Sequence, residues 1–230
     1  MFITSFAAGP WQTNCYVVAA PGADRCVVID PGVQATDVVA RVVSEAGLDV
    51  AGVLLTHGHI DHVASAADVA DAAGVPAWIP EADRELLSDA GPVLAPAVDL
   101  LRSLGGDLRE PADLRLLQGG ETIEVAGLSF DVVHAPGHRP GCVMFRLALP
   151  QDPDDPDHPD EVVFTGDVLF AGTIGRTDLP GGDPDVMVAT LRDVVLTLPD
   201  GALVLPGHGE RTTMAAEKAG NPYLQPRFLS

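Results

Sequence analysis

Four short apolar segments in this sequence end in turns that carry histidine or aspartate. The segments are Ala51–Thr56, Leu128–His134, Glu161–Thr165 and Ala202–Leu205. Short runs of this composition are typical of β-strands that are covered on at least one face. Loops at strand ends are where side chains from distant parts of a chain converge, so we expect these turns to build one site.

Helical patterns alternate with the strands in the first half of the chain. A hairpin-rich start, Cys15–Ala20 and Arg25–Asp30, precedes a helix over Thr36–Ala46, whose valines recur at helical spacing. Gly47 ends that helix, and Ser65–Ala73 returns to helix. This stretch therefore predicts strand and helix in alternation.

The second half is predicted to contain a further group of strands. Glu81–Arg109 reads as helix in pieces, broken by Pro92 and Pro96, and the polar run Gln151–Asp160 reads as a solvated loop. Further elements are predicted at Thr122–Val125, Cys142–Leu147, Asp185–Leu198 and Arg211–Ala219. Two groups of strands with interspersed helices predict an α/β fold, a four-layer αββα sandwich, in a single domain over residues 1–230.

Composition excludes several classes of partner. The chain has 33 acidic and 13 basic residues, a net charge of −20, which disfavours nucleic acid and anionic membranes. No apolar run approaches the roughly 20 residues of a membrane-spanning helix, and the start of the chain lacks the pattern of a signal peptide. We expect a cytoplasmic protein whose three cysteines are buried, reduced thiols.

The segment THGHIDH at residues 56–62 is the strongest chemical signal. Three histidines and an aspartate lie within six positions, directly after a predicted buried strand. A lone histidine is usually a core or surface residue, but four side chains of metal-ligand type in one loop favour a metal site. Imidazole and carboxylate without thiolate suit zinc, with iron or manganese as alternatives. A catalytic zinc needs only three protein ligands, so the loop indicates two ions.

Three further residues occupy the same kind of position. His138, Asp167 and His208 each follow a predicted strand, and each has glycine as a neighbour. Taken singly, each fits a turn residue with a capping or hydrogen-bonding duty. Beside the 56–62 loop, they are candidate metal ligands, and the glycines allow the backbone to approach an ion closely.

These motifs resemble the metallo-β-lactamase superfamily and, within it, the glyoxalase II group, the hydroxyacylglutathione hydrolases. The matching segments are THGHIDH (56–62), APGHRPG (135–141), TGDVLFAGTIGRTDLPGGD (165–183) and LPGHGERTTMAAEKAGNPYL (205–224). The resemblance implies the metallo-β-lactamase fold and two divalent metal ions, most commonly zinc. It implies that the first ion is held by His57, His59 and His138. The second would be held by Asp61, His62 and His208, with Asp167 bridging the two.

The resemblance further implies a thioester hydrolase that converts an S-2-hydroxyacylglutathione to a 2-hydroxy acid and thiol, a reaction of methylglyoxal detoxification. Water bound to such ions loses a proton near pH ~7 and becomes a hydroxide nucleophile. The thiolate, whose conjugate acid has a pKa of ~8.5, leaves without a general acid. Asp61 and Asp167 are then catalytic residues. Because only 22 residues follow His208, another low-molecular-weight thiol is an alternative carrier.

Two residues outside the ligand set have competing interpretations. Arg176 can bind a substrate carboxylate, or it can pair with Asp178 two positions later. Asp30 is expected to be a buried hydrogen-bonding residue beneath the metal loop rather than a catalytic one. The sequence gives no indication of oligomeric state.

Two other functions remain open at this point. A persulfide dioxygenase of the same fold uses one iron, which His57, His138 and Asp167 would hold here. A module that binds metal or a partner without catalysis is the other alternative. Iron-dependent oxygen consumption with a persulfide, or bound metal without turnover, would distinguish these from the small-molecule thioesterase.

Overall fold

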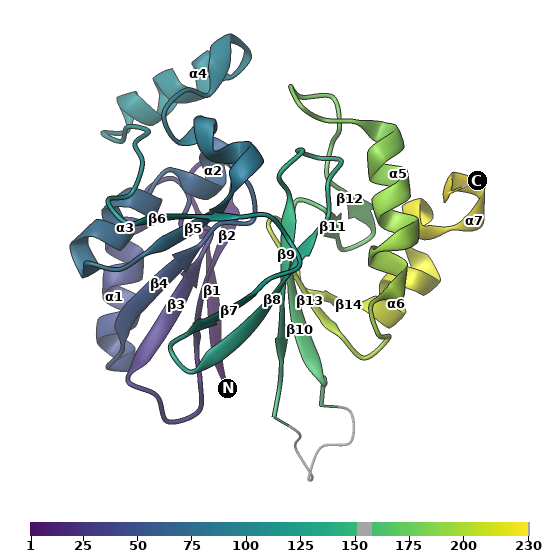
Figure 1. The fold of residues 1–230 in the computed structure, drawn as a ribbon, viewed down its shortest axis with the longest axis horizontal. Helices are drawn as coiled ribbons and strands as arrows, with labels where there is room; N and C mark the ends of the chain where they lie inside the picture. Colours follow the sequence, from purple (N-terminus) through teal and green to yellow (C-terminus); the bar gives the residue numbers. More distant parts are fainter. Residues whose placement is uncertain (151–157, 230) are drawn as a thin grey trace.

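The computed structural model describes residues 1–150 and 158–229. These residues form two six-stranded sheets that face one another, with helices on the outer side of each sheet (Figure 1). The predicted α/β four-layer sandwich is therefore confirmed.

The first sheet has the strand order β1-β2-β3-β4-β5-β6. Its first three strands pair antiparallel, as expected from the hairpin-rich start, and β3 to β6 run parallel. The strands are β1 (Phe2–Ala8), β2 (Thr13–Ala19), β3 (Arg25–Ile29), β4 (Asp49–Leu54), β5 (Ala77–Pro80) and β6 (Leu114–Leu117).

The second sheet has the order β14-β13-β10-β9-β8-β7 and is antiparallel except for the β10–β13 pair. A two-stranded sheet, β11-β12, lies beside it. The strands are β7 (Thr122–Val125), β8 (Leu128–His134), β9 (Val143–Ala148), β10 (Glu161–Gly166), β11 (Leu169–Phe170), β12 (Thr173–Ile174), β13 (Leu203–Pro206) and β14 (Thr212–Thr213).

Helices α1 and α3 cover the first sheet, and α5 and α6 cover the second, whereas α4 lies beyond the end of the first sheet (Figure 1). The α-helices are α1 (Thr36–Ala46), α2 (Ile60–Val63), α3 (Ala66–Ala73), α4 (Gly91–Ser103), α5 (Pro184–Asp193), α6 (Met214–Gly220) and α7 (Pro226–Leu229). The 3-10 turns are η1 (Glu81–Leu87), η2 (Val195–Thr197) and η3 (Pro222–Leu224).

Alternation along the central strands produces three apolar layers. In β10, Phe164 faces the core between the sheets, whereas Val163 faces the helices on the outside. In the first sheet, Leu54 of β4 faces the inner core and Val53 packs against α1 and α3. Because side chains alternate with period two along a strand, one apolar run supplies both layers.

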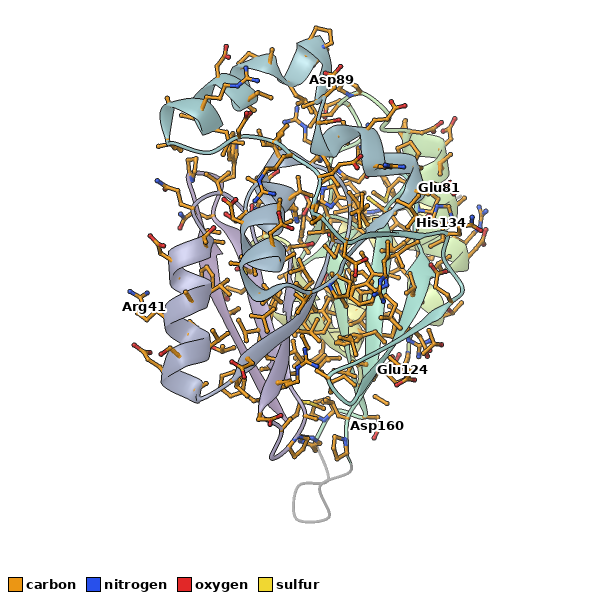
Figure 2. The ribbon with its side chains drawn as sticks, turned by 60° about the vertical axis from the view of Figure 1, so that its left-hand side comes forward. Arg41, Glu81, Asp89, Glu124, His134 and Asp160 are labelled. Atoms are coloured by element: carbon orange, nitrogen blue, oxygen red, sulfur yellow. The ribbon has the colours of Figure 1, made fainter. Side chains whose placement is uncertain are left out.

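The ends of several strands meet at one edge of the sandwich. There Val143 N donates to Thr56 O at 2.9 Å, and Asn14 N donates to Gly207 O at 2.7 Å, which joins the two sheets. Figure 2 shows Asp160, which precedes β10, near the bottom of the molecule, His134, at the end of β8, well above it, and Arg41 pointing away from α1. The predicted ligand turns therefore share the edge that carries His134.

Several predicted elements differ in detail. Helix α4 contains both prolines. Pro92 lies in its first turn, where proline is tolerated, and Pro96 lies inside the helix, where it removes one backbone hydrogen bond without ending the helix. The helix predicted over Asp185–Leu198 is divided into α5 and η2, and the one predicted from Arg211 starts only at Met214, after β14. Of the predicted loop Gln151–Asp160, residues 151–157 lie outside the described residues.

The three cysteines are free and buried, as predicted. Among the described residues, no helix combines the length and the apolar character that crossing a bilayer requires.

Candidate metal centre

Seven side chains from four turns converge at the shared edge. We call His57, His59 and His138 the first cluster and Asp61, His62 and His208 the second cluster; within each, one ligand atom per residue lies within 4.8 Å of the others. A third group, His57, His62 and Asp167, meets the same criterion and connects them. The structure thus brings together all seven residues that the sequence singled out.

The first cluster presents three imidazole nitrogens to one point. His59 Nδ1 lies 3.1 Å from His57 Nε2 and 2.8 Å from His138 Nε2. His59 precedes α2 with an extended backbone, and Gly58, between the two histidines, leaves no room for a side chain because a Cβ there would collide with Asp83. His138 reaches the same point from the turn after β8.

Asp167 lies between the clusters. Its Oδ1 is 3.2 Å from His62 Nε2, and its Oδ2 is 3.6 Å from both His138 Nε2 and His208 Nε2. In the second cluster, Asp61 Oδ2 is 3.2 Å from His208 Nε2 and 3.5 Å from His62 Nε2. The two carboxylate oxygens of Asp167 therefore face different partners, which is the arrangement that a bridging ligand needs.

In three of the five ligand histidines, the ring nitrogen that faces away from the cluster has a hydrogen-bond partner, whereas His59 Nε2 has none among the described residues. His62 Nδ1 lies 2.9 Å from Asp30 Oδ2, His138 Nδ1 donates to the Arg176 carbonyl at 2.7 Å, and His57 Nδ1 is 3.1 Å from Thr56 Oγ1. Such partners fix ring orientation and leave the other nitrogen free for a metal. Asp30 is 2% exposed, which confirms its predicted buried, hydrogen-bonding role.

Burial and charge give the two clusters different protonation. Burial lowers the pKa of His57 and His138, and lowers that of His59 to about 3, so the first cluster is neutral. Burial also acts to lower the pKa of His62, but the nearby carboxylates of Asp167, Asp61 and Asp30 outweigh it and raise the pKa. Neutral imidazole is the form that binds metal, so the first cluster is ready to accept an ion.

The donor set fits divalent metal ions. His62 Nε2 and Asp167 Oδ1 are buried and, within the described part of the chain, have no hydrogen-bond partner. A side chain at Gly207 would fill the same space, since its Cβ would collide with Asp167 Oδ1. Buried polar atoms without partners are costly, and imidazoles with carboxylates are the ligands of zinc and iron. The clusters are consistent with a dinuclear site.

Arg176 is placed beside the centre by its backbone. Its side chain makes a bidentate contact with Asp178 at 2.6 and 2.7 Å and is largely exposed. It also lines a hollow of about 390 Å³ together with Gly175, Tyr223 and Phe228. Gly175 packs so closely on the Asp167 carbonyl that a Cβ would collide with it. A role of Arg176 toward substrate stays a prediction.

Some residues that hold the site had no signal in the sequence. Thr13 Oγ1 donates to Asp61 Oδ2 at 2.8 Å across 48 positions of sequence. Asp83, wholly buried, accepts a hydrogen bond from Gly58 N at 2.9 Å. Neither residue lies in a metal-ligand motif, and both act through contacts that only the folded chain creates.

Comparison with known proteins agrees with this geometry. Residues 8–153 match the family model described as the metallo-beta-lactamase superfamily. An uncharacterized protein of Mycobacterium tuberculosis is 42% identical over 227 residues, covering 98% of each chain. Hydroxyacylglutathione hydrolase GloC of Haemophilus influenzae is 35% identical over 214 residues, covering 93% of each chain.

Solved structures show the same fold over nearly the whole chain. A crystal structure named BLEG-1 B3 metallo-beta-lactamase has a TM-score of 0.82 at 32% identity, covering 97% of this chain and all (100%) of that one. A protein named TTHA1623, in a di-iron-bound form, has a TM-score of 0.72 at 35% identity with the same coverage, 97% and 100%.

Proposed function

The chain belongs to the metallo-β-lactamase superfamily, and from that premise we propose that it is a dinuclear hydrolase of the glyoxalase II type that cleaves small 2-hydroxyacyl thioesters. The observation that carries the proposal is the pair of complete ligand clusters joined by Asp167. The relative named as a hydroxyacylglutathione hydrolase supports the choice of substrate class.

In this proposal, the first ion is held by His57, His59 and His138. The second would be held by Asp61, His62 and His208, and Asp167, which lies between the two clusters, would be a ligand of both ions. Two divalent ions held there, zinc by preference, would supply an activated water as the nucleophile and a Lewis acid for the carbonyl oxygen.

The protein's own side chains set the geometry of the reaction. Asp167 is held between His62 and His138, so its two oxygens fix the separation of the clusters. Thr13 holds the carboxylate of Asp61 at 2.8 Å, and Asp61 in turn faces His208. Asp61 and Asp167 are in this sense the catalytic carboxylates that the sequence predicted.

A thioester suits the described site. Its carboxylates and imidazoles are metal ligands or hydrogen-bond to metal ligands, so they are not available as general acids. A thiolate can leave without a proton from a general acid. Arg176 lines the neighbouring hollow, where its guanidinium would contact a carboxylate of the acyl group or of the thiol. Such a contact has to replace the present pairing of Arg176 with Asp178.

A single-iron dioxygenase is the second candidate function, because His57, His138 and Asp167, the residues that would hold its iron, lie together here as well. Metal stoichiometry and oxygen uptake decide between it and the dinuclear hydrolase.

The test is elemental analysis of the purified protein alongside hydrolysis of lactoylglutathione, other acyl thioesters and a β-lactam. We expect about two metal ions per chain and thioester cleavage, with both reduced in His59→Ala. His158→Ala is the matched control, because His158 precedes β10 at the end opposite Asp167. Cleavage of the β-lactam alone, oxygen uptake with a thiol persulfide, or bound metal with every thioester left intact would each contradict the proposal.

A further inference from the structure

A buried ion pair connects the loops that supply the first cluster. Asp83, in η1, is wholly buried, and its Oδ1 lies 3.0 Å from Arg139 Nη2. The Arg139 side chain is only 11% exposed, and its other terminal nitrogen, Nη1, donates to the Pro180 carbonyl. The pair is therefore placed between three loops rather than on the surface.

Each end of this ion pair is next to a member of the first cluster. Asp83 Oδ2 accepts a hydrogen bond from Gly58 N at 2.9 Å, and Gly58 is the residue between His57 and His59. Arg139 directly follows His138. The pair thus connects the backbone beside two ligands from the first sheet to the backbone beside the ligand from the second sheet.

Asp83 is closely packed against both ligand loops. A Cβ on Gly58 would lie 2.8 Å from the Asp83 carbonyl oxygen, and a Cβ on Gly141 would lie 2.9 Å from the Asp83 carboxyl carbon. Asp83 therefore fills the gap between the two ligand loops, and its carboxylate cannot shift without moving one of them.

We propose that the Asp83–Arg139 ion pair is a positioning device that sets the distance of His138 from His57 and His59. The inference rests on the proposed function only in that the first cluster binds metal. Mutating a residue that orients a metal ligand without binding the metal itself typically lowers metal affinity about 10- to 100-fold. Lysine cannot replace Arg139, because a single ammonium does not reproduce the two guanidinium nitrogens that contact Asp83 and Pro180 at once.

The test measures the affinity of each cluster separately. In a His208→Ala background only the first cluster is complete, and in a His59→Ala background only the second. Arg139→Met and Arg139→Lys are introduced into both, and Zn²⁺ affinity is measured by competition with a chromophoric chelator. The absorption spectrum of bound Co²⁺ reports the ligand geometry independently of turnover.

We expect Arg139→Met to weaken the first cluster about 10- to 100-fold and the second by less than about threefold. Arg139→Lys should recover little of the loss. Asp83→Asn, which keeps an oxygen for Gly58 N but loses the charge, should add little to Arg139→Met. Arg146→Met is the matched control, because Arg146 pairs with the largely buried Glu161 at 2.6 Å but contacts no ligand loop among the described residues.

Equal affinities in Arg139→Met and Arg146→Met, or equal losses at both clusters, would overturn the inference. A protein that binds metal tightly but cleaves no thioester would contradict the proposed function and leave the inference standing. If neither background binds metal, both are wrong.

Discussion

Asp30 Oδ2 accepts a hydrogen bond from His62 Nδ1 at 2.9 Å in the interior of the protein. The same carboxylate accepts from Thr56 N at 2.8 Å and from Thr56 Oγ1 at 2.7 Å. Asp30 therefore connects the end of β4 to α2, and when a metal displaces one proton of His62, Asp30 keeps the other on Nδ1. The Nε2 atom, which faces Asp61 and Asp167, is left to bind metal.

Replacing Asp30 by asparagine tests this relationship. The amide oxygen can still accept from Thr56 N, but its NH₂ group would face His62 Nδ1 as a donor and force the histidine proton onto Nε2. We expect metal affinity at the second cluster to fall about 10- to 100-fold. Chelator competition in the His59→Ala background measures this loss. An Asn variant that binds metal as tightly as the parent would show that the tautomer of His62 is not set by Asp30.

Gly207→Ala tests whether activity depends on the space that Gly207 leaves beside the Asp167 carboxylate. The added Cβ would collide with Asp167 Oδ1 and lie 2.7 Å from His62 Cε1, so the bridging carboxylate must move. A displacement of about 1 Å at a reacting centre can cost about 100-fold in rate, and we expect a loss of that order in kcat.

Gly201→Ala is the control for this change. A Cβ added at Gly201 would have no atom of the described residues within 4 Å, and the backbone there is not left-handed, so alanine is tolerated. The unfolding temperature of Gly201→Ala should remain close to that of the parent, whereas the collision in Gly207→Ala should lower it, so kcat is compared at a temperature where both variants are folded. If Gly207→Ala keeps full activity, Asp167 is not held as closely as the structure indicates.

The sequence predicted elements whose signals are local. The bounds of α1, Thr36–Ala46, are those expected from the valine spacing and from Gly47, which adopts a left-handed conformation with φ of 65°. Strand β6, Leu114–Leu117, was not predicted, because its place is decided by parallel pairing with β5 rather than by its own pattern. Local patterns therefore predict elements such as α1, β7 and β8, but not a strand whose place depends on pairing with its neighbour.

The same distinction holds in the metal centre. His57, His59, Asp61 and His62 are metal-ligand residues that follow one another closely in one turn, so their convergence could be predicted from their spacing. Asp83 could not, because its partner Gly58 lies 25 positions away and neither residue type signals the contact. The candidate metal ligands form a recognisable sequence motif, whereas the residues that hydrogen-bond to the ligand loops are determined by tertiary packing.

Substitutions of Arg176 and Asp178 should change KM in opposite directions. Arg176→Met should raise KM for an anionic thioester about tenfold, the value of one charge-assisted hydrogen bond. Asp178→Asn, which releases the guanidinium from its bidentate contact, should lower KM. Steady-state kinetics on one substrate measures both.

Metal content should be unchanged in both variants, because His138 bonds to the Arg176 carbonyl rather than to its side chain. If both variants leave KM unaltered, Arg176 is only a surface ion pair. If metal is lost, the residue acts on the centre rather than on substrate.

The buried thiols predict a loss of stability at alkaline pH. Burial raises the pKa of the Cys26 thiol from 9.0 to about 11, with Asp49 adding to the effect, and burial also raises the pKa of Cys15, Cys142 and Tyr16. The unfolded chain therefore releases these protons from about pH 9, while the folded chain retains that of Cys26 to about pH 11. The contribution of the thiols to stability should be constant below pH ~9 and be lost as the pH rises toward ~11, measured as the urea midpoint of the metal-free protein. Cys26→Ala should show a shallower decline of the urea midpoint with pH.

The burial of the thiols can also be tested by chemical modification: a thiol reagent at pH 8 should modify no cysteine until urea unfolds the chain. Rapid modification of the native protein would mean that these thiols are not enclosed as the structure places them.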